Sequence, residues 1–250
     1  MRVQKLDWDS DFFGFPVGRL MEWGGQQSAQ SILRLVRDSG CRVVYAASKS
    51  LQPGLETHYV LTQVELEMSF AHGPDSASAR ESGEGREADL HGLTRVVIEK
   101  HRGPADAALR ELARQAGWSS RFCVDKRFGR STFKALYAKW IERSCSVEIA
   151  DVVLTALLGQ TRAGLVTGTL RPPMAKIGLI AVDSDSRGLG VGRLLMEQFA
   201  SLAMEAGCSG LSVVTQAENV PAMRLYSRVG FEEVQRLHWY HVWNDSGEPV

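Results

Sequence analysis

A run of three alternating glycines stands directly before a strongly helical segment, at Gly188, Gly190 and Gly192. A helix start leaves backbone N–H groups without partners and carries the positive end of the helix dipole. Glycines let a ligand come close to that backbone. The amides up to Arg193 could therefore bind a diphosphate, and the Arg187 side chain would add a charge-assisted hydrogen bond.

Other glycine-rich phosphate loops fit this segment less well. A Walker loop ends in Gly-Lys-Ser/Thr, which is absent here, and the dinucleotide pattern G-x-G-x-x-G would place its third glycine at Arg193. A left-handed glycine turn that binds no ligand is the alternative, because short glycine motifs also arise by chance.

A second pattern, QAENVPAMRLYSRVGF, begins at Gln216. Asn219 is a natural N-cap, Pro221 is tolerated in a first helical turn, and Tyr226 lies two turns beyond the cap on the same face. This tyrosine could equally be a core residue, the commoner role of a helical tyrosine in isolation, beside Ala222, Leu225 and Val229.

Together the two patterns resemble the GCN5-related N-acetyltransferase (GNAT) superfamily. Its R/Q-x-x-G-x-G/A signature is met at Arg187, Gly190 and Gly192, and its tyrosine-containing turn is matched at Asn219, Tyr226, Gly230 and Phe231. The resemblance implies that acetyl-coenzyme A is the co-substrate and that Tyr226 protonates the departing thiolate. A phenol with a pKa of about 10 stays protonated at neutral pH, beside a thiol of about 8.5.

The resemblance also implies an α/β (α+β) fold: a mixed β-sheet flanked by helices and splayed between two strands, with coenzyme A entering the gap. Pantetheine would add strand-like hydrogen bonds to Ile180–Val182, and an N–H near Val182 would stabilise the developing oxyanion. The implied coenzyme-binding residues are Ile180, Ala181, Val182, Arg187, Gly188, Leu189, Gly190, Val191, Gly192, Arg193, Asn219 and Ala222.

Short segments in both halves of the chain look like the dTDP-fucosamine acetyltransferases: Leu6–Gly14, Ser119–Phe122, Phe133–Glu142, Thr215–Asn219 and His238–Tyr240. This likeness implies that the acceptor is the amine of a dTDP-linked amino sugar used in cell-surface polysaccharide biosynthesis. The opening aromatics could instead simply pack beneath a strand. Arg121 and Phe122 could hold a phosphate and stack a base, or be an ordinary surface pair.

Periodicity predicts an N-terminal α/β domain (residues 1–70), a flexible linker (71–92) and the acetyltransferase domain (93–244). Small, polar and charged residues dominate the linker. Helices are expected at Ser28–Asp38, from Pro104 to Gly117, at Ser131–Arg143 and at Arg193–Ala206. Strands are expected at Val43–Tyr45, Val64–Phe70, Arg95–Glu99, Val152–Leu158, Gly164–Leu170, Lys176–Val182 and Leu211–Thr215.

Composition excludes some partners. Lys plus Arg equals Asp plus Glu at 29 each, so no overall field attracts nucleic acid or an anionic membrane. The four cysteines form no C-x-x-C pair, and we expect neither a signal peptide nor a membrane span, so the expected location is the cytoplasm. The expected partner is a small-molecule amine, and a homodimer stays open.

No metal is expected, because His238 and His241, three apart on a predicted strand, point to opposite faces. Asp183 and Ser186 could simply cap a helix, and a water-relayed base is the alternative to a carboxylate. Two rival functions remain. One is acetylation of a protein or polyamine, and the other is non-catalytic binding of acyl-coenzyme A, which need not keep both Asn219 and Tyr226.

Overall fold

The computed structural model describes residues 1–23, 27–70, 86–90 and 94–244. Its strands form one mixed sheet: β1 (Arg2–Lys5), β2 (Val17–Met21), β3 (Val43–Ser48), β4 (Tyr59–Ser69), β5 (Arg86–Leu90), β6 (Thr94–Lys100), β7 (Val152–Leu158), β8 (Thr161–Thr169), β9 (Met174–Val182), β10 (Gly210–Gln216) and β11 (Glu232–Trp243). Its α-helices are α1 (Asp7–Phe13), α2 (Ala29–Asp38), α3 (Ala107–Ala116), α4 (Arg121–Val124), α5 (Arg130–Cys145), α6 (Val191–Glu205) and α7 (Val220–Arg228). Short 3₁₀ helices are η1 (Glu56–His58), η2 (Lys126–Phe128) and η3 (Ser184–Ser186).

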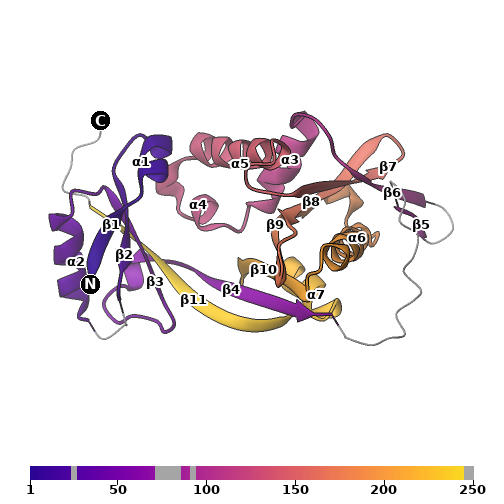
Figure 1. Ribbon diagram of the computed structural model, residues 1–250. Coiled ribbons are helices and arrows are strands. Elements are labelled where there is room, and N and C mark those ends of the chain that lie inside the picture. Colours follow the sequence, from indigo (N-terminus) through magenta and orange to yellow (C-terminus); the bar gives the residue numbers. More distant parts are fainter. Residues whose placement is uncertain (24–26, 71–85, 91–93, 245–250) are drawn as a thin grey trace.

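The strand order is β1-β2-β3-β11-β4-β10-β9-β8-β7-β6-β5. Neighbouring strands are antiparallel except for the parallel pairs β2–β3 and β9–β10. Two long strands, β4 and β11, pair with each other and extend from beside β3 to the region of β10 and α7 (Figure 1). The expected mixed sheet flanked by helices is therefore confirmed.

Strands β9 and β10 separate partway along their length. Their parallel pairing covers only four residue pairs and ends at Ile177 opposite Val213. Strand β9 continues to Val182 and β10 to Gln216 without pairing to each other. This is the expected splay, and it leaves the inner backbone edge of β9 without a strand partner.

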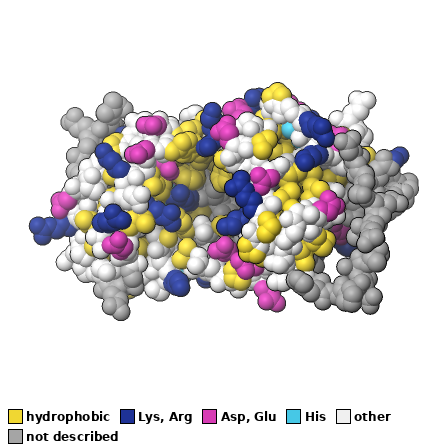
Figure 2. Space-filling model, in the orientation of Figure 1, with side chains coloured by type: hydrophobic (Ala, Val, Ile, Leu, Met, Phe, Trp, Pro, Cys, Tyr) yellow, Lys and Arg dark blue, Asp and Glu magenta, His cyan; other side chains and the backbone are white. Residues whose placement is uncertain are grey.

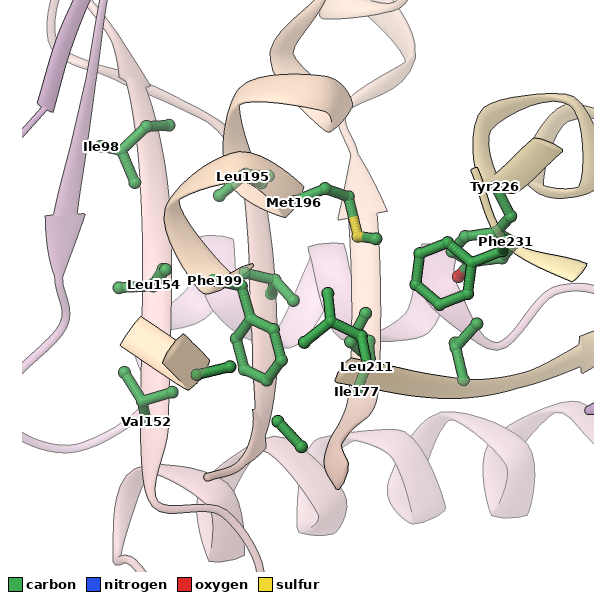
Figure 3. Close-up of a cluster of buried hydrophobic side chains, with 14 of the residues drawn as sticks. Ile98, Val152, Leu154, Ile177, Leu195, Met196, Phe199, Leu211, Tyr226 and Phe231 are labelled. Atoms are coloured by element: carbon green, nitrogen blue, oxygen red, sulfur yellow. The ribbon is translucent and has the colours of Figure 1, made fainter. Parts of the chain in front are cut away.

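The main hydrophobic core packs α6 against the sheet. Leu195, Met196 and Phe199 of this helix point toward Leu154 of β7 and Leu211 of β10, and Tyr226 and Phe231 close the same cluster (Figure 3). These helix positions recur with the three- and four-residue spacing of an amphipathic helix. The core thereby fixes the start of α6, which carries the glycine loop, beside the end of β9.

Residues of the predicted N-terminal domain also belong to this core. Val64 and Leu66 of β4 belong to the same buried cluster as α6 and β10, and β4 lies between β10 and β11 in the sheet. The sheet thus passes without a break across the boundary expected near residue 70, and the division into two domains stays a prediction.

Most of the segment expected as a flexible linker lies outside the described residues. Within it, Arg86–Leu90 forms β5, which pairs antiparallel with β6. The expected helices and strands are present within a few residues of their predicted bounds. Helices α1 and α4 were not predicted.

Candidate active site

The glycine loop has the geometry of an anion site. Gly188 and Gly190 adopt positive φ angles of 81° and 78°, and Gly190 is the N-cap of α6 without any side-chain capping bond. Within the described residues, no backbone N–H from Gly188 to Arg193 donates a hydrogen bond. Consecutive unpaired amides at a helix start are what a diphosphate needs.

Side chains around the loop leave that backbone open. A Cβ built on Gly188 would meet nothing within 4 Å, and Leu189 is exposed. The Arg187 guanidinium is exposed and donates from Nε to the Val182 carbonyl at 3.3 Å. Arg193 is paired with Glu197 at 2.7 Å. Arg187 is thus the loop cation not committed to a carboxylate, because Arg193 is already neutralised.

Val191 and Gly192 have structural roles in the packing of α6. Val191 is buried in the core, so only its backbone faces the loop. A Cβ on Gly192 would lie 3.2 Å from Leu225 Cδ2 and 3.4 Å from Val182 Cγ2. That spacing is tighter than ordinary van der Waals contact, so glycine here lets α6 approach α7 and β9 closely.

Strand β9 turns alternate backbone groups toward the splay. The Asp183 N–H donates to the Ala163 carbonyl at 2.8 Å on the β8 side. Because antiparallel strands alternate, Ala181 also faces β8, whereas the N–H and C=O groups of Ile180 and Val182 point into the gap. The edge predicted to bind pantetheine is therefore open at Ile180 and at the Val182 N–H, whereas the Val182 carbonyl accepts from Arg187. Ala181 lies between them, with its side chain in the core.

A β-bulge sets the point at which β9 leaves β10. In the pairing with β8, Thr167 faces Leu179 and Gly168 faces Ile177, so Gly178 is an extra residue. The Leu179 N–H donates to Thr167 Oγ1 at 3.0 Å at this point. Bulges bend a strand and re-aim its groups. The role of Gly178 was not predicted from the sequence, although a glycine inside a strand pattern is a known sign of a bulge.

Helix α7 places Asn219, Ala222 and Tyr226 at the same gap. Asn219 is the N-cap and accepts from the Ala222 N–H at 3.4 Å, as predicted. Tyr226 is only 2% exposed, and its ring lies 5.4 Å from that of Phe231. Within the described residues its hydroxyl makes no hydrogen bond, and burial raises its pKa above the ordinary value of 10.0.

One pocket joins these elements, with a volume of about 560 Å³. Ile180, Asn219, Ala222 and Tyr226 line one end of it. The loop residues Arg187–Arg193 are not among its lining residues and lie beyond it, at the start of α6. Figure 2 shows the molecule hollowed between its two ends, with Lys and Arg side chains bordering the hollow.

The other end of the pocket is polar and aromatic. Its lining includes side chains from α1, α4, α5, β4 and β11, among them Trp8, Asp9, Gln63, Arg121, Trp140, Arg143 and Trp239. Burial raises the pKa of Asp9, and the nearby Arg121 opposes that shift. Asp9 and Trp239 lie in two of the segments that resemble the sugar acetyltransferases, but no site role was predicted for them or for Gln63 and Arg143, because these residues become neighbours only through the fold.

Among the described residues, no group of three or more His, Cys, Asp or Glu side chains is arranged to hold a metal ion. The two β11 histidines are separated as expected: His238 Nδ1 lies 3.0 Å from Thr62 Oγ1, and His241 is fully buried beside Asp125. In the described part of the chain, no helix has the length and apolar character to cross a membrane.

This arrangement defines a class of protein. The sequence profile of the Acetyltransferase (GNAT) family matches residues 111–231, which run from α3 to the end of α7 and contain the glycine loop and Tyr226. The chain therefore contains a GNAT acetyltransferase domain, as the sequence signature predicted. Enzymes of this family use acetyl-coenzyme A, and the unpaired loop amides and the open β9 edge fit that molecule.

Individual relatives are similar at modest identity. The spore coat polysaccharide biosynthesis protein SpsD of Bacillus subtilis is 26% identical over 141 residues, which cover 56% of this chain and 48% of SpsD. The dTDP-fucosamine acetyltransferase of Escherichia coli is 29% identical over 136 residues, covering 54% of this chain and 58% of that enzyme. The chain thus spans about half the length of these curated relatives.

A solved structure shares the fold over nearly the whole chain. It is a conserved protein of unknown function from Staphylococcus epidermidis, with a TM-score of 0.57 and 14% identity, covering 92% of this chain and 84% of that one. At that identity the likeness concerns the fold alone, and it extends to the N-terminal strands outside residues 111–231.

Proposed function

We propose that this protein is an acetyl-coenzyme A-dependent N-acetyltransferase whose acceptor is the amino group of a dTDP-linked amino sugar. The observation that carries the proposal is one pocket that Tyr226 and Ile180 of β9 line at one end and polar and aromatic residues line at the other, which we take as the acceptor end. The names of the two curated relatives support a sugar acceptor and a role in polysaccharide biosynthesis.

In this mechanism acetyl-coenzyme A supplies the acetyl group as a thioester. The amides from Gly188 to Arg193 bind its diphosphate, with Arg187 beside them. The backbone edge at Ile180 and Val182 holds the pantetheine arm as an added strand. A backbone N–H of this edge stabilises the negative charge that develops on the carbonyl oxygen.

Tyr226 then acts as the general acid. The neutral acceptor amine forms the new C–N bond, the C–S bond breaks, and the Tyr226 hydroxyl donates a proton to the departing sulfur. The amine loses its own proton to solvent through water, and solvent returns a proton to the Tyr226 phenolate before the next turnover. Burial raises the pKa of Tyr226, so the phenol is protonated and able to donate throughout the neutral range.

A panel assay tests the proposal. Purified protein with acetyl-coenzyme A is offered dTDP-amino sugars, polyamines and peptides with free amines, and the release of free thiol is followed. We expect turnover with a dTDP-amino sugar. Turnover confined to polyamines or peptides would move the acceptor to those classes. Coenzyme binding without turnover of any amine would indicate a non-catalytic acyl-coenzyme A module.

A further inference from the structure

Arg121 occupies an unusual position at the acceptor end of the pocket. Its guanidinium carbon lies 4.0 Å from the ring centre of Tyr45, 4.3 Å from Phe122 and 4.4 Å from Trp239. Within the described residues, no carboxylate comes within 4.0 Å of its nitrogens. Burial lowers its pKa to about 10, so it remains a cation at neutral pH.

A relay of side chains orients this cation. His241 is fully buried, and its Nδ1 lies 2.9 Å from Asp125 Oδ2 while its Nε2 lies 3.3 Å from Arg121 Nη1. Burial lowers the pKa of His241 to about 4, so the ring is neutral. Nδ1–H therefore donates to Asp125, and Nε2 accepts from Arg121. The Asp125 carboxylate also accepts from Trp243 Nε1 and Arg127 Nε, at 2.8 and 2.9 Å.

The surrounding charges leave Arg121 without a direct counter-ion. Arg143, the other arginine lining the pocket, is paired with Glu148 at 2.8 Å. Asp9 lines the pocket and favours the charged form of Arg121 through space, while Arg19 opposes it. A cation withdrawn from water without a bound carboxylate is costly unless an anion completes the site.

Two further features of the acceptor end of the pocket suit a nucleotide. Trp239 Nε1 is buried and has no hydrogen-bond partner among the described residues. Trp8, stacked on Phe12 at 5.2 Å, is 46% exposed and lines the pocket. Exposed indole faces stack well on planar rings, and an arginine fork suits phosphate oxygens.

We propose that Arg121 binds a phosphate of the acceptor and that Asp125 and His241 position its guanidinium for that contact. The protein thereby selects phosphorylated acceptors, such as a nucleoside diphosphate-linked amino sugar, over the same amine without phosphate. This inference rests on the proposed function and adds the residue that recognises the substrate class.

Calorimetry on the full chain tests the contact, with dTDP and inorganic pyrophosphate as probes. Titrations are done at saturating coenzyme A, so that the glycine loop is already occupied. We expect Arg121→Met to weaken dTDP binding by roughly 10- to 100-fold, the range for losing charge-assisted hydrogen bonds. Arg110→Met is the matched control. It removes an arginine that is paired with Glu142 at 3.0 Å and is not among the residues lining the pocket, so it should change dTDP affinity by less than about threefold.

Kinetics separates recognition from chemistry. In Arg121→Met, KM for a dTDP-amino sugar should rise while KM for acetyl-coenzyme A and turnover of the free amino sugar stay unchanged. If Arg121→Met lowers the melting temperature too far for use, Arg121→Lys keeps the charge but loses the planar fork. It should still weaken dTDP binding severalfold.

The outcomes also separate this inference from the proposed function. Wild-type protein that acetylates an amino sugar but binds neither probe would overturn the phosphate contact and leave acetyl transfer intact. Equal losses in the Arg121 and Arg110 variants would overturn it as well. Arg121-dependent binding of dTDP without turnover of any amino sugar would support the contact and reject the proposed acceptor.

Discussion

A single substitution can distinguish a structural role of Tyr226 from a catalytic one. Tyr226 lines the pocket, and its hydroxyl makes no hydrogen bond among the described residues, so Tyr226→Phe removes no hydrogen bond. We expect the melting temperature and the coenzyme A affinity to stay unchanged. The value of kcat should fall by about 10²- to 10⁴-fold, which is typical of losing a general acid. Steady-state kinetics and calorimetry on one preparation measure both.

Tyr240→Phe is the matched control. This tyrosine is equally buried, but its hydroxyl accepts from the Gln52 N–H at 2.9 Å and lies away from the pocket. Its loss should cost about 1 kcal/mol of stability and leave kcat unchanged. A Tyr226→Phe protein whose kcat stays within about threefold of the parent would exclude Tyr226 as the proton donor.

The lowered pKa of His241 predicts that the stability of the fold depends on pH. Burial lowers its pKa from 6.5 to about 4. Between those values the unfolded chain binds a proton that the folded protein does not, so stability is full above pH 6.5 and falls as the pH drops toward 4. The loss amounts to about 3 kcal/mol. Below that window, protonation of Asp125, whose pKa its hydrogen bonds lower despite burial, acts in the same direction.

Urea unfolding at several pH values between 7.5 and 4.5 checks this expectation. His241→Asn removes the titrating group, so its stability should depend less on pH across the window than that of the parent. Parallel curves for the two proteins would show that His241 does not carry the effect.

At the scale of elements, the glycine loop should bind coenzyme A through its backbone. Gly190→Val puts a branched side chain at φ 78°, directly among the amides proposed to contact the diphosphate. We expect coenzyme A affinity to fall by at least about tenfold, the loss of one or more charge-assisted hydrogen bonds. Calorimetry with coenzyme A measures the change.

Gly159→Val controls for backbone strain. Gly159 lies in the turn between β7 and β8 at φ 60°, and a Cβ there would meet nothing within 4 Å. Both substitutions should therefore cost about 1–2 kcal/mol of stability for the left-handed conformation, but only the first should affect coenzyme binding. Equal affinities in the two variants would remove the loop from the binding site.

Elements with local signals were predictable from the sequence. Helices α2 and α7 were predictable because Ser28 and Asn219 are standard N-caps. Helix α6 was predictable from the periodicity of its apolar residues. Helix α1 has Leu6 at its N-cap and no side chain that is fully buried, and its Phe13 ring packs on Phe122 from α4. The acceptor end likewise depends on contacts between distant residues, such as Arg121 with His241, which no local pattern reveals.

At the scale of the whole molecule, the sheet joins the two predicted domains. Strand β4 pairs on one side with β10 and on the other with β11. Its Val64 and Leu66 are almost fully buried in the cluster around α6. The fold therefore predicts that the acetyltransferase half depends on residues before the linker for part of its core.

A chain beginning at residue 93 tests that dependence. Without β4, the fragment would expose the backbone edges of β10 and β11 and lose two core side chains. We expect it to aggregate or to lack a cooperative thermal transition, and to recover soluble structure and coenzyme A binding when a separate 1–92 fragment is added. The control is Leu66→Ala in the full chain, which should keep one cooperative transition at lower stability, by about 2–5 kcal/mol. A folded 93–250 fragment that binds coenzyme A as tightly as the full chain would instead support two independent domains.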